Sequence, residues 1–253
     1  MDPLYLVVPC YNEEECLPES ARIMRQKLLT LTAAGKISPQ SRLLLVDDGS
    51  ADKTWSIIRR LAEENEIVCG VKLRRNRGHQ NAVMAGLVTA LERGAGVTIT
   101  MDADLQDDID AIDQMVDKYA AGAAIVCGVR DNRDSDSFWK RSTAQGYYAL
   151  MNLCGAKLVY NHADFRLMSR EAVERLCCYG TSDLFLRGLI TRLGLPLEKV
   201  YYTRLPRTAG ESKYTVKKML QLAARGFTCG RMKPAESPQI GDLGIEQVYD
   251  GRL

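Results

Sequence analysis

Residues 97–106 read Val-Thr-Ile-Thr-Met-Asp-Ala-Asp-Leu-Gln, an apolar strand-like run that ends in two acids separated by one residue. Alternate side chains of an extended segment point to the same side, so we expect Asp102 and Asp104 to present their carboxylates together. Mg²⁺ and Mn²⁺ prefer oxygen ligands, and Mg²⁺ is typically held by one or two carboxylates with substrate phosphates. The alternative is an acidic loop in solvent in which one Asp caps the next helix.

Further apolar runs on both sides of this stretch alternate with helical patterns. Strands are expected at residues 4–8, 43–46, 67–73, 97–101 and 124–129, and helices at 13–31, 52–64 and 80–91. This alternation is typical of βαβ units, and continuous apolar strands fit a sheet that is covered on both faces. We therefore predict an α/β fold with a mostly parallel central sheet and helices on both faces. Ligands bind such sheets at the carboxyl ends of the strands.

Polar segments also follow three other expected strands, at residues 9–14, 47–50 and 74–82. An Asp at a strand end accepts hydrogen bonds from a base or ribose, and a basic turn that leads into a helix favours anions. Each segment alone also fits a capped helix or a solvated turn, but four at one edge favour a binding crevice. The chain contains neither GxGxxG nor GxxxxGK[ST], which argues against a Rossmann dehydrogenase and a P-loop NTPase.

The second half of the chain is less regular. Helices are expected at residues 136–153, 169–178, 182–193 and 215–227, and a strand at 199–203. Helix 215–227 has an apolar stripe with its Lys and Arg residues off that stripe. Such a helix can lie on a bilayer surface, and packing of the stripe against the protein core is the alternative. Residues 228–253 contain two prolines and no clear periodicity, so a loop or polar tail is predicted.

Composition excludes several classes of protein. The 253 residues are 46% hydrophobic and 26% charged with a net charge of +2, which excludes collagen, a coiled-coil rod and low-complexity disorder. This charge requires no nucleic-acid partner. No apolar run approaches the ~20 residues that span a bilayer. The first strand-like run begins at Leu4, so we expect no signal peptide. Eight scattered cysteines without a CxxC pair argue against a zinc site and favour a cytoplasmic location.

Seven motifs, in their order and spacing, resemble glycosyltransferase family 2 with a GT-A fold. The first four are VVPCYNEE, LLLVDDGSADKT, NRGHQNAVMAGL and DADLQD, which begin at residues 7, 43, 76 and 102. The last three are GVRDNRDSD, ADFRLMSR and GESKYTVKKML, which begin at residues 128, 163 and 210. They resemble the polyprenyl-phosphate branch, which includes dolichol-phosphate mannosyltransferases and bactoprenol-phosphate glucosyltransferases. The resemblance implies a GT-A catalytic domain at residues 1–227, including helix 215–227, and a polar tail at 228–253.

The resemblance also implies a role for each matching residue. The donor nucleotide is expected at Pro9, Tyr11, Glu13, Asp47, Asp48 and Ser50, with Arg77, Gly78 and His79 as further substrate-binding residues. The divalent metal, Mg²⁺ or Mn²⁺, is expected at Asp102, Asp104 and Gln106, with Ala103 at the substrate. Asp164 matches the catalytic base, and the residues expected to act on or lie near the acceptor are Arg130, Arg133, Arg166, Arg207, Ser212 and Lys213. For Arg130, Arg133 and Lys213, an ordinary surface role is the alternative.

The implied reaction is an inverting transfer of a hexose from a nucleotide sugar to polyprenyl phosphate. UDP-glucose is the favoured donor, followed by GDP-mannose and UDP-hexosamines. A phosphate monoester is already mostly dianionic near pH 7, because its second pKa is about 6. A sugar hydroxyl does need a base. With a lipid-phosphate acceptor, we therefore expect Asp164 to orient the site more than to remove a proton.

Two departures from the family pattern leave questions open. Asp108 stands where the family usually has Pro, and the chain continues from residue 227 into a polar tail where bacterial members often have two membrane-spanning helices. Either the chain is a peripheral form on the inner face of the membrane, or a membrane part is lost. The alternatives are a family 2 enzyme with a hydroxyl acceptor and a non-catalytic nucleotide-sugar-binding protein. Whether the chain forms a homo-oligomer stays open.

Overall fold

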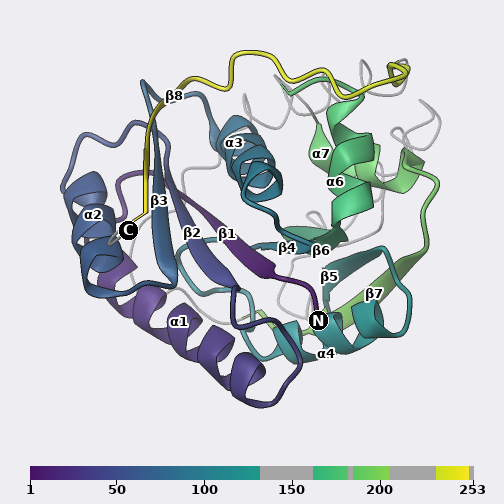
Figure 1. The fold of residues 1–253 in the computed structure, drawn as a ribbon, viewed down its shortest axis with the longest axis horizontal. Coiled ribbons are helices and arrows are strands. Elements are labelled where there is room, and N and C mark those ends of the chain that lie inside the picture. The colour runs from purple at the N-terminus through teal and green to yellow at the C-terminus, as the bar shows by residue number, and fades with distance from the viewer. Residues whose placement is uncertain (132–161, 182–184, 205–231, 251–253) are drawn as a thin grey trace, which may run out of the picture.

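The computed structural model describes residues 1–131, 162–181, 185–204 and 232–250, and its strands form one sheet of eight (Figure 1). The strands are β1 (Leu4–Cys10), β2 (Arg42–Asp47), β3 (Val68–Leu73), β4 (Val97–Thr100), β5 (Ile125–Arg130), β6 (His162–Ser169), β7 (Leu197–Tyr202) and β8 (Ile245–Tyr249). Their order is β7-β5-β6-β4-β1-β2-β3-β8, and only β6 and β8 among them run antiparallel to their neighbours. The predicted α/β fold with a mostly parallel sheet is confirmed.

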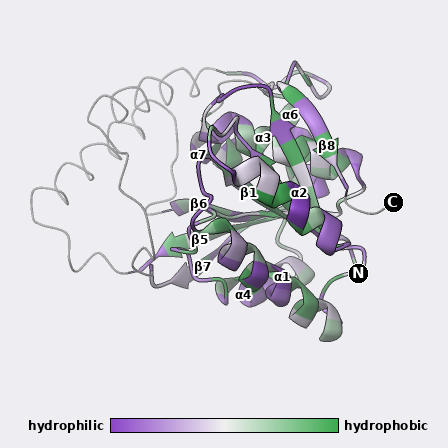
Figure 2. Cartoon of the chain, turned by 90° about the vertical axis from the view of Figure 1, so that its left-hand side faces the viewer, coloured by the Kyte–Doolittle hydropathy of each residue, from purple (hydrophilic) through white to green (hydrophobic). Residues whose placement is uncertain are grey.

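Helices cover both faces of this sheet, as predicted. They are α1 (Leu17–Ala33), α2 (Thr54–Glu64), α3 (His79–Glu92), α4 (Ala111–Ala120), α6 (Arg170–Cys177), α7 (Leu186–Leu189) and the short 3₁₀ helix η1 (Ile190–Arg192). Buried residues of α3, α6 and α7 form one core cluster with the sheet, and those of α1, α2 and α4 form the other. Figure 2 shows the two layers, with α1 and α4 on one side of the strands and α3 and α6 on the other.

Strand β1 explains why the first half of the fold is readable from the sequence. Its side chains alternate between the two cores, with Tyr5 and Val7 in the α3 cluster and Leu6 and Val8 in the α1 cluster. Both faces are therefore apolar, which produces a continuous apolar run. Helix α3 lies so close to this strand that a Cβ on Gly86 would lie 2.3 Å from Val7 Cγ1.

The structure differs from the sequence prediction in the second half. Strand β6 and helix α4 were not predicted, and the helix expected at 182–193 is represented by the shorter α7 and η1. The prediction that 228–253 is a loop or tail is wrong for β8, which pairs with β3. A five-residue edge strand obtains its hydrogen bonds from a distant segment, so its own sequence carries little signal. The helices expected at 136–153 and 215–227 lie outside the described residues.

Among the helices of the described residues, none combines the length and the apolar character that a bilayer span requires.

Candidate active site

The ends of β1 and β2 are joined by hydrogen bonds, as expected for neighbouring parallel strands. The backbone N–H of Asn12 donates to Ser50 Oγ at 3.0 Å, and Ala51 N donates to Asn12 Oδ1 at 2.9 Å. Glu13 N donates to Thr54 Oγ1 at 2.9 Å. The segment that holds Pro9, Tyr11 and Glu13 therefore lies beside the segment that holds Asp48 and Ser50, and Tyr11 is 39% exposed there.

Asp48 locks the end of β2 to the basic turn after β3. Its Oδ1 accepts a hydrogen bond from Arg77 N at 2.7 Å, and its Oδ2 accepts one from Gly78 N at 2.9 Å. Burial raises the pKa of Asp48, and these two N–H donors oppose the rise. Gly49 has a φ of +65°, and a Cβ there would lie 2.5 Å from Asn76 N. Only glycine allows the two segments to approach this closely.

Two residues predicted to bind substrate have other partners in this structure. Asp47 is fully buried and accepts a hydrogen bond from Ser50 N at 3.2 Å, so it supports the turn from beneath. The Arg77 side chain turns to the C-terminal segment, where its Nη1 donates to the Asp242 carbonyl oxygen at 2.7 Å. Arg74 Nη2 donates to both carboxylate oxygens of Asp242 at 2.6 Å. Residue 242 therefore covers part of the basic turn.

The predicted metal ligands follow β4. The Asp102 side chain is 42% exposed, and Asp104 Oδ1 accepts a hydrogen bond from Gln106 N at 3.2 Å. Gln106 is 7% exposed, and its Oε1 accepts a hydrogen bond from Arg204 Nη2. No group of three or more His, Cys, Asp and Glu placed to hold a metal occurs among the described residues. Two carboxylates nonetheless fit a hard divalent cation that also binds a diphosphate, and Gln106 as a ligand stays a prediction.

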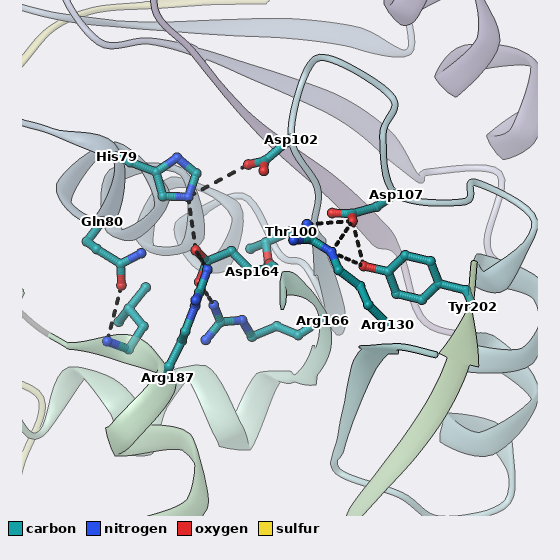
Figure 3. A network of polar contacts seen from close by, with 11 residues as sticks. His79, Gln80, Thr100, Asp102, Asp107, Arg130, Asp164, Arg166, Arg187 and Tyr202 are labelled. Carbon is teal, nitrogen blue, oxygen red and sulfur yellow. Dashed lines mark hydrogen bonds and ion pairs between the residues drawn. The ribbon is translucent and has the colours of Figure 1, made fainter. Parts of the chain in front are cut away.

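Asp107 fixes this acidic loop to β5 and β7. Its Oδ1 accepts hydrogen bonds from Arg130 Nε at 3.1 Å, Arg130 Nη2 at 2.8 Å and the Tyr202 hydroxyl at 2.5 Å (Figure 3). Burial and the Asp107 carboxylate raise the pKa of Tyr202. Neither Asp107 nor Tyr202 was predicted from the sequence, although Asp107 closes the DADLQD motif. Arg130, expected to face phosphates, here positions the loop.

Four donors surround the carboxylate of Asp164. Arg187 donates from Nε to Oδ1 at 3.2 Å and from Nη2 to Oδ2 at 2.8 Å, and Arg166 Nη2 also donates to Oδ1. His79 Nε2 lies 3.5 Å from Oδ2 (Figure 3). Burial raises the pKa of Asp164, but Arg187, His79 and Arg166 outweigh burial and hold it well below the usual value. Asp164 is therefore an ionised carboxylate at neutral pH.

His79 bridges the two acidic parts of the site. Its Nε2 lies 3.5 Å from Asp164 Oδ2 and 3.8 Å from Asp102 Oδ1, and its side chain is 40% exposed. Burial lowers the pKa of His79, but the carboxylates of Asp164 and Asp102 outweigh burial and raise it. His79 thus connects the predicted metal-side carboxylate with the predicted acceptor-side carboxylate.

Arg166 and Arg187 hold Asp164 from different depths. Arg166 is 1% exposed, so it lies beneath the site, and its Nε and Nη1 have no hydrogen-bond partner among the described residues. Arg187 is 30% exposed and belongs to α7. The start of α7 is also tied to α3, because Leu186 N donates to Gln80 Oε1 at 3.2 Å. Arg187 was not predicted from the sequence, because nothing in an ordinary helical pattern marks a contact with a distant strand.

Four predicted site residues lie outside the described residues, namely Arg133, Arg207, Ser212 and Lys213. The roles assigned to them stay predictions. The described residues bring together the predicted positions of the first four motifs and Asp164, at the carboxyl ends of β1, β2, β3 and β4.

Comparison with known proteins gives one family. The family model described as Glycosyl transferase family 2 matches residues 5–177. The chain is 46% identical to "Uncharacterized glycosyltransferase YkoT" of Bacillus subtilis, over 91% of this chain and 68% of that protein. It is 36% identical to "Bactoprenol glucosyl transferase" of Shigella phage SfV, over 88% of this chain and 70% of that protein.

A solved structure shares the fold. The glucosyl-3-phosphoglycerate synthase of Mycobacterium tuberculosis, crystallised with Mn²⁺, UDP-glucose and phosphoglyceric acid, superposes with a TM-score of 0.57 at 14% identity. The match covers 99% of this chain and 90% of that one. Together with the sheet order and the helices on both faces, this likeness identifies the fold as GT-A type.

Proposed function

Because the chain belongs to glycosyl transferase family 2, we propose that it transfers a hexose from a nucleotide sugar to a polyprenyl phosphate. UDP-glucose is the proposed donor, with GDP-mannose as the second choice. The name of the phage relative, bactoprenol glucosyl transferase, supports both the sugar and the lipid. The observation that carries the acceptor class is the arrangement around Asp164, where four donors face one carboxylate.

The number of those donors bears on the chemistry of the acceptor. An ionised carboxylate has about four lone-pair sites, and guanidinium and imidazole nitrogens face Asp164 on both of its oxygens. A carboxylate in this state is a poor proton acceptor. A hydroxyl acceptor needs a base, whereas a phosphate monoester is already ionised near pH 7. The arrangement therefore favours a phosphate acceptor.

The donor is proposed to bind across the ends of β1 and β2. Asp48 and the turn that it holds would lie beside the base and ribose, and Tyr11 offers an exposed aromatic ring there. The diphosphate would lie towards Asp102 and Asp104. Mg²⁺ or Mn²⁺ held by these two carboxylates would neutralise charge on the leaving diphosphate.

The proposed step is a single inverting displacement. An oxygen of the acceptor phosphate forms a bond to the anomeric carbon, while the bond from that carbon to the diphosphate oxygen breaks. No proton has to leave the acceptor. His79 and the arginines around Asp164 would keep the local charge positive where the two anionic substrates meet.

The proposed location is the cytoplasmic side of the membrane, with peripheral contact. This proposal depends on the sequence of residues 215–227, whose apolar stripe and flanking Lys and Arg residues are the pattern of a helix that lies on a bilayer surface. Liposome flotation of the full chain tests it: binding to vesicles with anionic lipid is expected, and the same protein in neutral vesicles is the control. Failure to float with anionic vesicles would contradict membrane contact.

The transfer itself is tested with purified full chain, Mn²⁺, a panel of radiolabelled nucleotide sugars and polyprenyl phosphate. Label that extracts into organic solvent is the expected product. Asp102→Asn should abolish it, while Asp113→Asn, which removes a surface carboxylate that pairs with Lys27, should not. Label that stays in water and appears only with a sugar or polysaccharide acceptor would show that the acceptor is a hydroxyl group. Absence of nucleotide release with every donor would favour a non-catalytic protein.

A further inference from the structure

The donors around Asp164 come from three different elements. Arg166 lies two residues further along β6, His79 begins α3, and Arg187 lies on α7. A contact within one strand is fixed by the strand itself. The contact from α7 depends instead on where the fold places that helix. It can therefore differ without any change in β6 itself.

Arg187 differs from the other donors in its geometry. It is the one side chain among them with hydrogen bonds to both carboxylate oxygens, through Nε at 3.2 Å and Nη2 at 2.8 Å. Bidentate pairing of a guanidinium with a carboxylate is both strong and directional. Arg166 makes a single contact from beneath, and His79 makes one long contact of 3.5 Å. Arg187 therefore makes more hydrogen bonds to the carboxylate oxygens of Asp164 than Arg166 or His79 does.

Arg187 is also placed where a change in it would alter the site and leave the core intact. Its side chain is 30% exposed, compared with 1% for Arg166. Helix α7 keeps a second anchor, the hydrogen bond from Leu186 N to Gln80 Oε1. Loss of the Arg187 guanidinium would therefore uncover Asp164 without removing the attachment of α7 to α3.

We propose that Arg187 determines the acceptor class, because by holding both oxygens of Asp164 it prevents this carboxylate from taking a proton from a hydroxyl group. This inference rests on the proposed function above and adds the residue responsible for its acceptor choice. Arg187 acts through Asp164, so it is a positioning residue.

The two acceptor classes differ in whether the acceptor oxygen must lose a proton during the transfer. With a phosphate acceptor, a carbon–oxygen bond forms at the anomeric carbon, the bond to the leaving diphosphate breaks, and no proton is released. With water or a sugar hydroxyl, the same bonds form and break, but one proton leaves the acceptor oxygen. Removal of Arg187 would free a lone pair on each oxygen of Asp164 to take that proton, and a well-placed general base typically contributes a factor of about 100 or more.

The test compares Arg187→Gln and Arg187→Lys with the unaltered chain. Two products are measured with the same donor and Mn²⁺, namely sugar transferred to polyprenyl phosphate and free sugar formed by hydrolysis when acceptor is omitted. Arg187→Gln should lower the first about tenfold, because a positive charge near the anionic acceptor is lost. It should raise the second about fivefold, because Asp164 becomes better able to accept a proton. Arg187→Lys keeps the positive charge but lacks the planar fork that holds both oxygens, so it should retain most of the transfer while hydrolysis still rises by a smaller factor.

Arg175→Gln is the matched control. Arg175 donates to Leu193 O at 2.8 Å and so also binds the segment that contains α7 and η1, but it pairs with Glu171 and not with Asp164. Both products should keep their original rates in this variant. Urea unfolding of every variant identifies loss of fold, and Arg187→Lys decides the question if Arg187→Gln does not fold.

A merely structural role of Arg187 would lower both products. It would not lower transfer and raise hydrolysis at the same time. The inference is overturned if hydrolysis falls with transfer or stays unchanged in Arg187→Gln, or if the unaltered chain already glycosylates hydroxyl acceptors well. The proposed function is judged separately, on the unaltered chain alone. If that chain labels no lipid phosphate with any donor, the proposed function fails, while the hydrolysis comparison still decides the role of Arg187.

Discussion

The guanidinium of Arg130 donates two hydrogen bonds, of 3.1 and 2.8 Å, to the same carboxylate oxygen of Asp107. The Asp107 side chain is 2% exposed, so its charge is compensated almost wholly by this arginine and by the Tyr202 hydroxyl. The acidic loop that carries Asp102 and Asp104 is anchored through this contact to β5 and β7. The anchoring has a measurable consequence for stability.

Arg130→Met should lower the free energy of unfolding by about 3 kcal/mol, because it leaves a buried carboxylate without its positively charged partner. Urea unfolding measures the change. Lys36→Met is the matched control, since Lys36 pairs with Asp117 in an exposed salt bridge, and such pairs contribute about 0–1 kcal/mol. Equal losses in the two variants would contradict the anchoring role of Arg130.

Gly49→Ala should destabilise the chain more than Gly94→Ala. Both glycines have positive φ, +65° and +83°, so an alanine at either costs about 1–2 kcal/mol of backbone strain. A Cβ at Gly94 meets nothing within 4 Å, whereas at Gly49 it would lie 2.5 Å from the backbone of residue 76. Overpacking of this kind adds about 1–3 kcal/mol.

Thermal unfolding of the two glycine variants measures the difference. Gly49→Ala should also weaken donor binding, because it moves the turn whose N–H groups hold Asp48. A donor affinity that is unchanged in Gly49→Ala would separate the turn from the donor site and count against the proposed place of the nucleotide.

Removal of the metal-side carboxylates should abolish stabilisation by the donor. A nucleotide sugar at about 100 times its dissociation constant stabilises a protein by about 2.7 kcal/mol. With Mn²⁺ present, the unaltered chain should therefore melt at a higher temperature with the donor than without it. Asp102→Asn and Asp104→Asn should lose most of it, as should the unaltered chain after EDTA, whereas Asp113→Asn should keep it. Full stabilisation in EDTA would argue against metal-dependent donor binding.

The burial of His162 should make the stability of the protein depend on pH. It is 4% exposed, and burial together with the positive charge of Arg166 lowers its pKa well below the usual value. An unfolded histidine takes up a proton near pH 6.5, while the folded one resists protonation. Its contribution to stability is therefore present in full above about pH 6.5 and is lost as the pH falls below it.

Urea midpoints at about pH 7.5, 6.5 and 5.5 test this effect of His162. The unaltered chain should lose more stability between the highest and the lowest pH than His162→Asn does. Carboxylates and the other histidine are common to both chains, so they cancel in the comparison. Identical slopes in the two chains would show that the pKa of His162 is the same in the folded and unfolded states.

The sequence predicted the first half of the fold well because its strands are buried on both faces. The apolar runs of β1 and β2 and the polar residues that follow them mark both the sheet and its functional edge. Strand β6 carries Asp164 and Arg166 in its middle and was recognised only as a motif, because charged residues interrupt the apolar pattern.

The contacts that organise the site were harder to predict. Arg187 and Asp164 are 23 residues apart and meet only through the tertiary fold, and Tyr202 meets Asp107 across 95 residues. Spacing along the chain carries no record of such pairs. Asp47 and Asp48 are another case, since two adjacent acids look alike in the sequence while one accepts a hydrogen bond from Ser50 and the other from the turn after β3.

Strand β8 has a consequence for association of the protein with itself. By pairing with β3, it covers the backbone N–H and C=O groups that β3 would otherwise offer to a strand of another chain. Within the described part of the chain, the new edge is only five residues long and carries Glu246, and the opposite edge, β7, carries Glu198 and Lys199. Short, charged edge strands resist edge-to-edge pairing, so the C-terminal segment protects this sheet against aggregation.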